Sequence, residues 1–217
     1  MAELKIAVLI SGRGTNLQAL IDACAADDYP ARIVLVVSNE PGAKGLDRAR
    51  AAKIASTVID HHDHPSREAF DAALAEAIRG SGADLVCLAG FMRIVADEFV
   101  RQWRDRLINI HPSLLPAFPG LNTHARAIEA GVRFSGCTVH FARTELDAGP
   151  IIAQAVVPVR SDDTPDSLAD RVLEAEHRIY PMALRLIAEG RVRVTNETVR
   201  ISGGAAPDTT LVSPLEE

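Results

Sequence analysis

The sequence predicts a single α/β domain built on an open, twisted, mostly parallel β-sheet with helices on both faces, which is a Rossmann-like arrangement. Three observations favour this fold class. Short apolar runs alternate with helical patterns through the first half of the chain. These runs are almost continuously apolar, as is typical of parallel strands buried on both faces. The later runs, from Gly136 onward, follow one another closely, so we expect the sheet to become mixed towards its last strands.

The apolar runs place the strands and the patterns between them place the helices. Strands are expected at residues 5–10, 32–38, 56–59, 84–89, 107–110, 136–141 and 151–158. Helices are expected at residues 16–26, 45–52, 66–79 and 96–103, and a turn should place His124 at the start of another. A long helix is expected over residues 165–189, and Pro181 should kink it or end its first half. Residues 192–194 and 199–201 should form a small hairpin.

Length and composition limit the classes of function. A chain of 217 residues suits one domain, expected at residues 1–202, and the tail over residues 203–217 lacks periodicity and is expected to be mobile. A net charge of -6 and an aromatic content of 4% argue against a nucleic-acid partner. No stretch is long enough to span a bilayer, so no membrane partner is expected. Three widely spaced cysteines favour a reducing cytoplasm.

The segment VLISGRGTNLQAL combines a strand, a glycine turn and the start of a helix. Glycines at positions 12 and 14 let the backbone curl, and the amides of the first helical turn near Thr15 and Asn16 then face outward. Such amides attract an anion, and a monophosphate is favoured because Leu17 replaces the third glycine of a dinucleotide motif. The alternative is a tight turn without a ligand, in which Thr15 caps the helix.

The segment LINIHPSLLP places Asn109 and His111 two residues apart at the end of a predicted strand, so both side chains should emerge on one face. Asp147, in the turn ELDAGP, could orient the histidine and stabilise its charged form. An amide, an imidazole and a carboxylate suit acyl transfer to an amine through a tetrahedral intermediate. The alternative is a structural strand end, with Asn109 capping a turn and His111 satisfied by the backbone.

Several motifs, taken together, extend the prediction. NIHPSLLP followed by FPG, with SGRGTN, LAGFMRI and ELDAGP, resembles the folate-dependent formyltransferase family, in order from about Lys5 to Gly190. The resemblance implies a mononucleotide-binding α/β fold on a mixed sheet. It also implies transfer of a formyl group from 10-formyltetrahydrofolate, as co-substrate, to the amine of glycinamide ribonucleotide in purine biosynthesis.

The same resemblance implies roles for individual residues. Asn109, His111 and Asp147 match the catalytic residues of the family. Gly14, Thr15, Asn16 and Glu176 match residues that bind the ribonucleotide. The residues that match the folate site are Arg67, Met92, Arg93, Ile94, Val95, Asn109, Arg143, Thr144, Glu145, Leu146 and Asp147.

Other readings stay open. A 10-formyltetrahydrofolate hydrolase would use the same three residues with water in place of the amine, and a non-catalytic mononucleotide-binding module would use only the first loop. The partners expected are small-molecule substrates, with a monomeric or weakly dimeric chain. The crowded segment DHHDH looks like a metal cluster, but adjacent residues rarely converge on one ion, so a solvated loop and no metal are expected.

Overall fold

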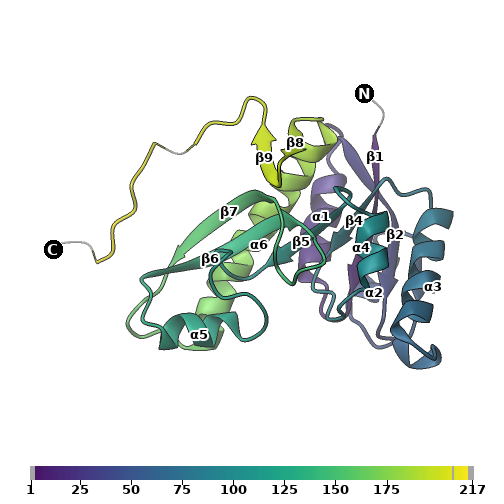
Figure 1. Ribbon diagram of the computed structural model, residues 1–217, viewed down its shortest axis with the longest axis horizontal. Helices are drawn as coiled ribbons and strands as arrows, with labels where there is room; N and C mark the ends of the chain where they lie inside the picture. Colours follow the sequence, from purple (N-terminus) through teal and green to yellow (C-terminus); the bar gives the residue numbers. More distant parts are fainter. Residues whose placement is uncertain (1–2, 207, 215–217) are drawn as a thin grey trace.

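A seven-stranded sheet forms the centre of the molecule, in a computed structural model that describes residues 3–206 and 208–214 (Figure 1). Its strand order is β3-β2-β1-β4-β5-β6-β7. The pairs from β3 through β5 are parallel, whereas β5–β6 and β6–β7 are antiparallel. The predicted fold class, including the mixed character of the last strands, is confirmed.

The elements follow the chain in the predicted alternation. The strands are β1 Leu4–Ile10, β2 Ala31–Ser38, β3 Ser56–Val58, β4 Leu85–Leu88, β5 Leu107–His111, β6 Phe134–Phe141, β7 Ile151–Pro158, β8 Val192–Thr195 and β9 Thr198–Ile201. The helices are α1 Thr15–Cys24, α2 Gly45–Ala51, α3 Arg67–Gly80, α4 Asp97–Gln102, α5 Thr123–Glu129 and α6 Pro165–Ala188, with a 3₁₀ turn, η1, at His61–Asp63.

Two apolar clusters cover the two faces of the sheet. The larger cluster joins buried side chains of α1, α2, α5 and α6 to the sheet, and the smaller joins those of α3 and α4. Strand side chains alternate between the clusters: Ile6 and Val8 of β1 belong to the first, Ala7 and Leu9 to the second. Burial on both faces explains why the first strands are apolar throughout. Among the described residues, no helix combines the length and the apolar character that crossing a membrane requires.

The structure corrects the prediction for the long helix. α6 is continuous through Pro181, so the predicted end of its first half is wrong. Proline removes only one helical hydrogen bond, and the buried face continues past it through Tyr180, Ala183 and Leu184. The predicted start is confirmed, because the Thr164 side chain accepts a hydrogen bond from Ser167 N and forms a capping box.

The remaining differences concern boundaries. The other predicted strands and helices are present within about two residues of their expected ends, as is usual for such boundaries. η1 was not predicted. Within residues 203–206 and 208–214 the structure has no helix or strand, whereas residues 207 and 215–217 of the predicted tail lie outside the described residues. The domain boundary at residue 202 stays a prediction.

The strand order creates a switch point between β1 and β4. From β1 the chain builds towards β3 on one side, and from β4 it builds towards β7 on the other. The loops that leave the two strands are joined at this point, where Ser11 N donates to Gly90 O at 3.2 Å. Open α/β sheets bind ligands at such a switch point, beyond the carboxyl ends of the strands.

Candidate active site

Asn109 and His111 lie on β5 and point to the same side of the strand, as their spacing requires. In the antiparallel ladder with β6, Asn109 lies opposite His140 and His111 opposite Thr138. His111 is 6% exposed and Asn109 is half-buried. Two polar side chains are therefore held at the edge of the core by a strand whose other residues are apolar.

Asp147 reaches this pair from the turn that follows β6. Its Oδ1 lies 3.3 Å from His111 Nδ1, and its Oδ2 accepts a hydrogen bond from Gly120 N at 2.7 Å. The backbone of Asp147 is left-handed, with φ 50°, a conformation that aspartate tolerates better than most residues. The three side chains of the predicted catalytic group are thus brought to one place from β5 and from the loop after β6.

Each ring nitrogen of His111 lies close to an oxygen atom. Nδ1 faces the Asp147 carboxylate and Nε2 lies 3.2 Å from Phe118 O, so both ring nitrogens face acceptors. Burial alone would raise the pKa of Asp147, but hydrogen bonds from His111 and Gly120 N outweigh it and hold this pKa below its ordinary value. The Asp147 carboxylate beside the His111 ring is therefore kept anionic.

His140 completes the surroundings of Asn109. Asn109 Nδ2 lies 3.3 Å from His140 Nε2, while His140 Nδ1 lies 3.1 Å from Phe141 O. The carbonyl requires the proton on Nδ1, so Nε2 accepts from the asparagine amide. Burial lowers the pKa of His140, which agrees with this neutral form. His140 thus fixes the orientation of the amide whose second N–H remains for a ligand.

The first glycine loop ends at the N-terminus of α1, beside α2. Gly14 caps α1 in the left-handed region, with φ 68° and no side-chain hydrogen bond, so Thr15 is not the cap that the alternative reading of this loop required. A Cβ on Gly14 would lie 2.6 Å from Gly45 Cα, and Gly45 N donates to Gly12 O at 3.0 Å. Only glycine allows this approach of two backbones, and the turn leaves the first amides of α1 without a side-chain acceptor.

Glu176 of α6 joins the glycine loop through Asn16. Asn16 Nδ2 donates to Glu176 Oε2 at 2.7 Å, and both side chains are buried. Burial raises the pKa of Glu176 to about 7, although Asn16 and the charge of His111 oppose the rise. Asn16 Oδ1 is also buried and has no partner among the described residues. A buried acceptor without a partner and a carboxyl whose pKa lies near neutrality are suited to bind a polar ligand.

Apart from Asn109 on β5, the residues predicted for folate binding fall into two loops and one helix start. Met92 and Ile94, in the loop after β4, are 72% and 63% exposed. Arg67 begins α3, and the charges of Arg67 and Arg93 both act on the buried carboxyl of Asp71. Large apolar side chains that face solvent beside two cations suit an aromatic ligand that carries carboxylates.

The loop after β6 also holds Arg143, whose guanidinium is already occupied. It donates to Glu197 Oε2 at 2.6 Å, to Asp105 Oδ1 at 2.7 Å and to Ala142 O at 3.0 Å. The side chain therefore anchors the loop to β8–β9, and its predicted role towards folate would fall to the backbone. Thr144, Glu145 and Leu146 are exposed, and Leu146 is 59% exposed.

Two contributors were not predicted from sequence. Phe118 O and Gly120 N, in the loop before α5, hold His111 and Asp147 through backbone atoms, so residue type gives no signal for them. His124 of α5 was predicted to lie at a helix start, and its Nδ1 is buried without a partner among the described residues. Burial and the charge of His111 lower the pKa of His124, which places the two rings in one electrostatic environment.

Known proteins are similar to this chain in sequence and in fold. The formyl transferase family model matches residues 4–184. The phosphoribosylglycinamide formyltransferase of Escherichia coli is 45% identical over 204 residues, which are 94% of this chain and 96% of that protein. The crystal structure of glycinamide ribonucleotide transformylase 1 from Symbiobacterium toebii has a TM-score of 0.90 and 52% identity, covering 92% of this chain and 94% of the other.

A third relative is much longer than this chain. The trifunctional purine biosynthetic protein adenosine-3 of Gallus gallus is 52% identical over 192 residues, which are 88% of this chain and 19% of that protein. The chain thus spans about a fifth of this relative. Because the family model covers most of the sequence, and the relatives align along nearly all of it, the chain belongs to the formyl transferase family.

Proposed function

We propose that this protein transfers the formyl group of 10-formyltetrahydrofolate to the amine of glycinamide ribonucleotide in purine biosynthesis. The observation that carries the proposal is the convergence of Asn109, His111 and Asp147 at the end of β5. The relatives named for this reaction are similar over nearly the whole chain, which favours it over a hydrolase or a binding module. Both substrates are small molecules, and neither a nucleic acid nor a membrane takes part.

In the proposed mechanism the substrate amine attacks the formyl carbon directly. The charged His111 and the free N–H of Asn109 stabilise the oxygen that becomes negative in the tetrahedral intermediate. The intermediate then collapses as the bond from the formyl carbon to N10 of the folate breaks. Asp147 supports His111 and helps to move the proton that the amine releases to N10, so that tetrahydrofolate leaves. The reaction needs no metal, because the imidazolium and the amide supply the positive field at the oxygen.

We assign the ribonucleotide to the glycine loop and the folate to the exposed loops. The phosphate binds the backbone amides of Gly14, Thr15 and Asn16, where the dipole of α1 favours an anion. Glu176 contacts the glycinamide or the ribose. The folate lies on the segments 92–95 and 143–147 with Arg67 beside it. The three free cysteines support a reducing cytoplasm as the site of action, and the chain acts as a monomer or a weak dimer.

Steady-state assays with both substrates test the proposal. Asn109→Ala and His111→Ala should each lower turnover by about 10²–10³ while the chain stays folded. His64→Ala, which removes a histidine far along the chain from β5, is the control and should keep normal turnover. Near-normal turnover by His111→Ala would refute the mechanism.

Omission of one substrate separates the alternatives. Formyl release that requires glycinamide ribonucleotide supports the transferase. Release that proceeds equally well without the amine would instead identify a hydrolase, and a chain that binds the nucleotide but never releases formyl would be a binding module.

A further inference from the structure

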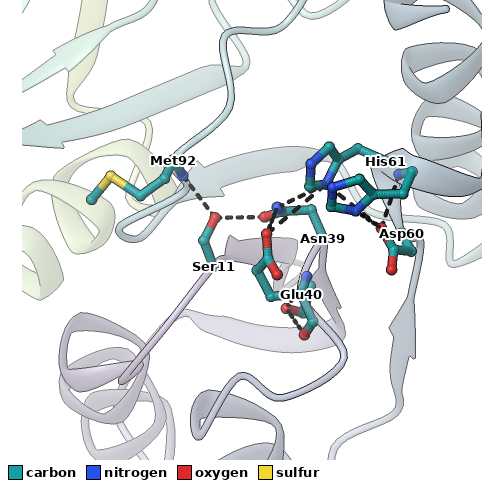
Figure 2. A network of polar contacts seen from close by, with 8 residues as sticks. Ser11, Asn39, Glu40, Asp60, His61 and Met92 are labelled. Atoms are coloured by element: carbon teal, nitrogen blue, oxygen red, sulfur yellow. Dashed lines mark hydrogen bonds and ion pairs between the residues drawn. The ribbon is translucent and has the colours of Figure 1, made fainter.

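Imidazole and carboxylate groups converge at the carboxyl ends of β2 and β3, in a cluster that the proposed reaction does not use (Figure 2). Asp60, His61 and His62 each offer a ligand atom, and these atoms all lie within 4.8 Å of one another. Glu40, from the loop after β2, approaches the same point. We call these four residues the 40/60 cluster.

The contacts that His61 makes within the 40/60 cluster suit an ion better than direct hydrogen bonds. His61 Nδ1 lies 3.7 Å from Asp60 Oδ1 and 3.9 Å from Glu40 Oε1, and both distances are too long for a hydrogen bond. Two ligands on one tetrahedral zinc ion lie about 3.3 Å apart, because each is about 2.0–2.1 Å from the metal. A shift of a few tenths of an ångström would bring these atoms to that spacing.

A short turn makes consecutive residues converge. Asp60 caps η1, and its Oδ1 accepts from His62 N at 2.9 Å and lies 2.8 Å from His62 Nδ1. The rings of His61 and His62 face each other with centroids 3.9 Å apart. This turn brings the three side chains together, and Glu40 joins them from the loop after β2. The sequence by itself could not predict this geometry.

Buried polar contacts hold Glu40, the member of the cluster that is distant in sequence, in place. Asn39 is 2% exposed, and its Nδ2 donates to Glu40 Oε1 at 3.0 Å and lies 3.5 Å from His61 Nδ1. Ser11 Oγ in turn donates to Asn39 Oδ1 at 2.5 Å and accepts from Met92 N at 2.7 Å, as the dashed lines in Figure 2 show. The hydrogen bond from Asn39 orients the Glu40 carboxylate, as such bonds do for carboxylate ligands of metal sites.

We propose that Glu40, Asp60, His61 and His62 bind one divalent transition-metal ion of the zinc class. Two imidazoles and two carboxylates match the nitrogen and oxygen ligands of tetrahedral zinc, whereas magnesium and calcium prefer ligands that are all oxygen. The ion joins β2 to the segment after β3 and stabilises the folded chain.

Zinc titration of the full chain, purified without a histidine tag and stripped with a chelator, tests the site. Calorimetry should give one zinc ion per chain, and zinc should raise the melting temperature. His61→Ala should lower the affinity by about 100-fold and remove the thermal shift, and Asn39→Ala should lower it by about 10–100-fold. Cobalt in place of zinc should give the visible spectrum of a tetrahedral ion. Magnesium should neither bind in calorimetry nor raise the melting temperature.

His64→Ala is the matched control, because His64 lies in the same segment and packs against Phe70 as His61 does, but lies outside the group of converging ligand atoms. It should bind zinc as the unchanged protein does. Three results would overturn the proposal: no zinc bound by the stripped protein, binding that survives His61→Ala, or an equal loss in His64→Ala. Formyl transfer should continue in His61→Ala, so this test is independent of the proposed reaction.

Discussion

Glu176→Gln should stabilise the protein at alkaline pH and leave it unchanged in acid. Glu176 is 6% exposed, and burial raises its pKa from 4.5 to about 7. Between pH 4.5 and about pH 7, the folded chain therefore keeps a proton on Glu176 that the unfolded chain has released. The stability that this proton contributes is fully present below about pH 4.5 and falls as the pH rises to about 7.

The size of the effect follows from the same two values. Each pKa unit corresponds to 1.36 kcal/mol, so ionisation of Glu176 costs the folded state about 3 kcal/mol above neutrality. Glutamine has no proton to lose and can still accept the hydrogen bond from Asn16. The difference in the free energy of unfolding, variant minus unchanged protein, should therefore grow by about 3 kcal/mol between about pH 4.5 and about pH 8.

Urea denaturation at several pH values measures this difference directly. Glu174→Gln is the control, because Glu174 is exposed on the same helix, and its curve should stay parallel to that of the unchanged protein. Parallel curves for Glu176→Gln would refute the reasoning, since the carboxyl would then titrate at the same pH in the folded and unfolded chains. The test needs no substrate and does not depend on the proposed reaction.

Three further predictions concern activity and stability. Asp147→Asn removes the anion beside His111 and should lower turnover by about 10²–10⁴ with little change in unfolding; the optimum pH should also shift. Gly14→Ala should cost at least about 1–2 kcal/mol in a melting experiment, because φ is 68° and the new Cβ would meet Gly45 at 2.6 Å. Thr164→Ala should cost about 1 kcal/mol in urea, through the lost cap of α6, while formyl transfer continues.

The sequence predicted the sheet well because local patterns determine it. Continuous apolar runs located β1, β2, β4 and β5, and the period of two placed Asn109 and His111 on one face. The sequence could not predict contacts that depend on how distant elements pack. Asn16 and Glu176 are 160 residues apart, and Glu40 meets His61 only because β2 and β3 are neighbours. The cap at Gly14 was missed because backbone strain, rather than side-chain chemistry, sets it.

Asp147 and Glu176, whose carboxyls both interact with the charge of His111, have opposite pKa shifts. Hydrogen bonds from His111 and Gly120 N hold the pKa of Asp147 below its ordinary value, whereas burial raises that of Glu176 to about 7. When the surroundings shift the pKa values of two acids in one site in opposite directions, the two acids take different roles. Asp147 stays anionic, and in the proposed reaction it supports His111 beside the developing oxyanion. Glu176 can gain or lose a proton near neutrality, so it can accept a hydrogen bond from a substrate amine or donate one to a hydroxyl without a large change in free energy.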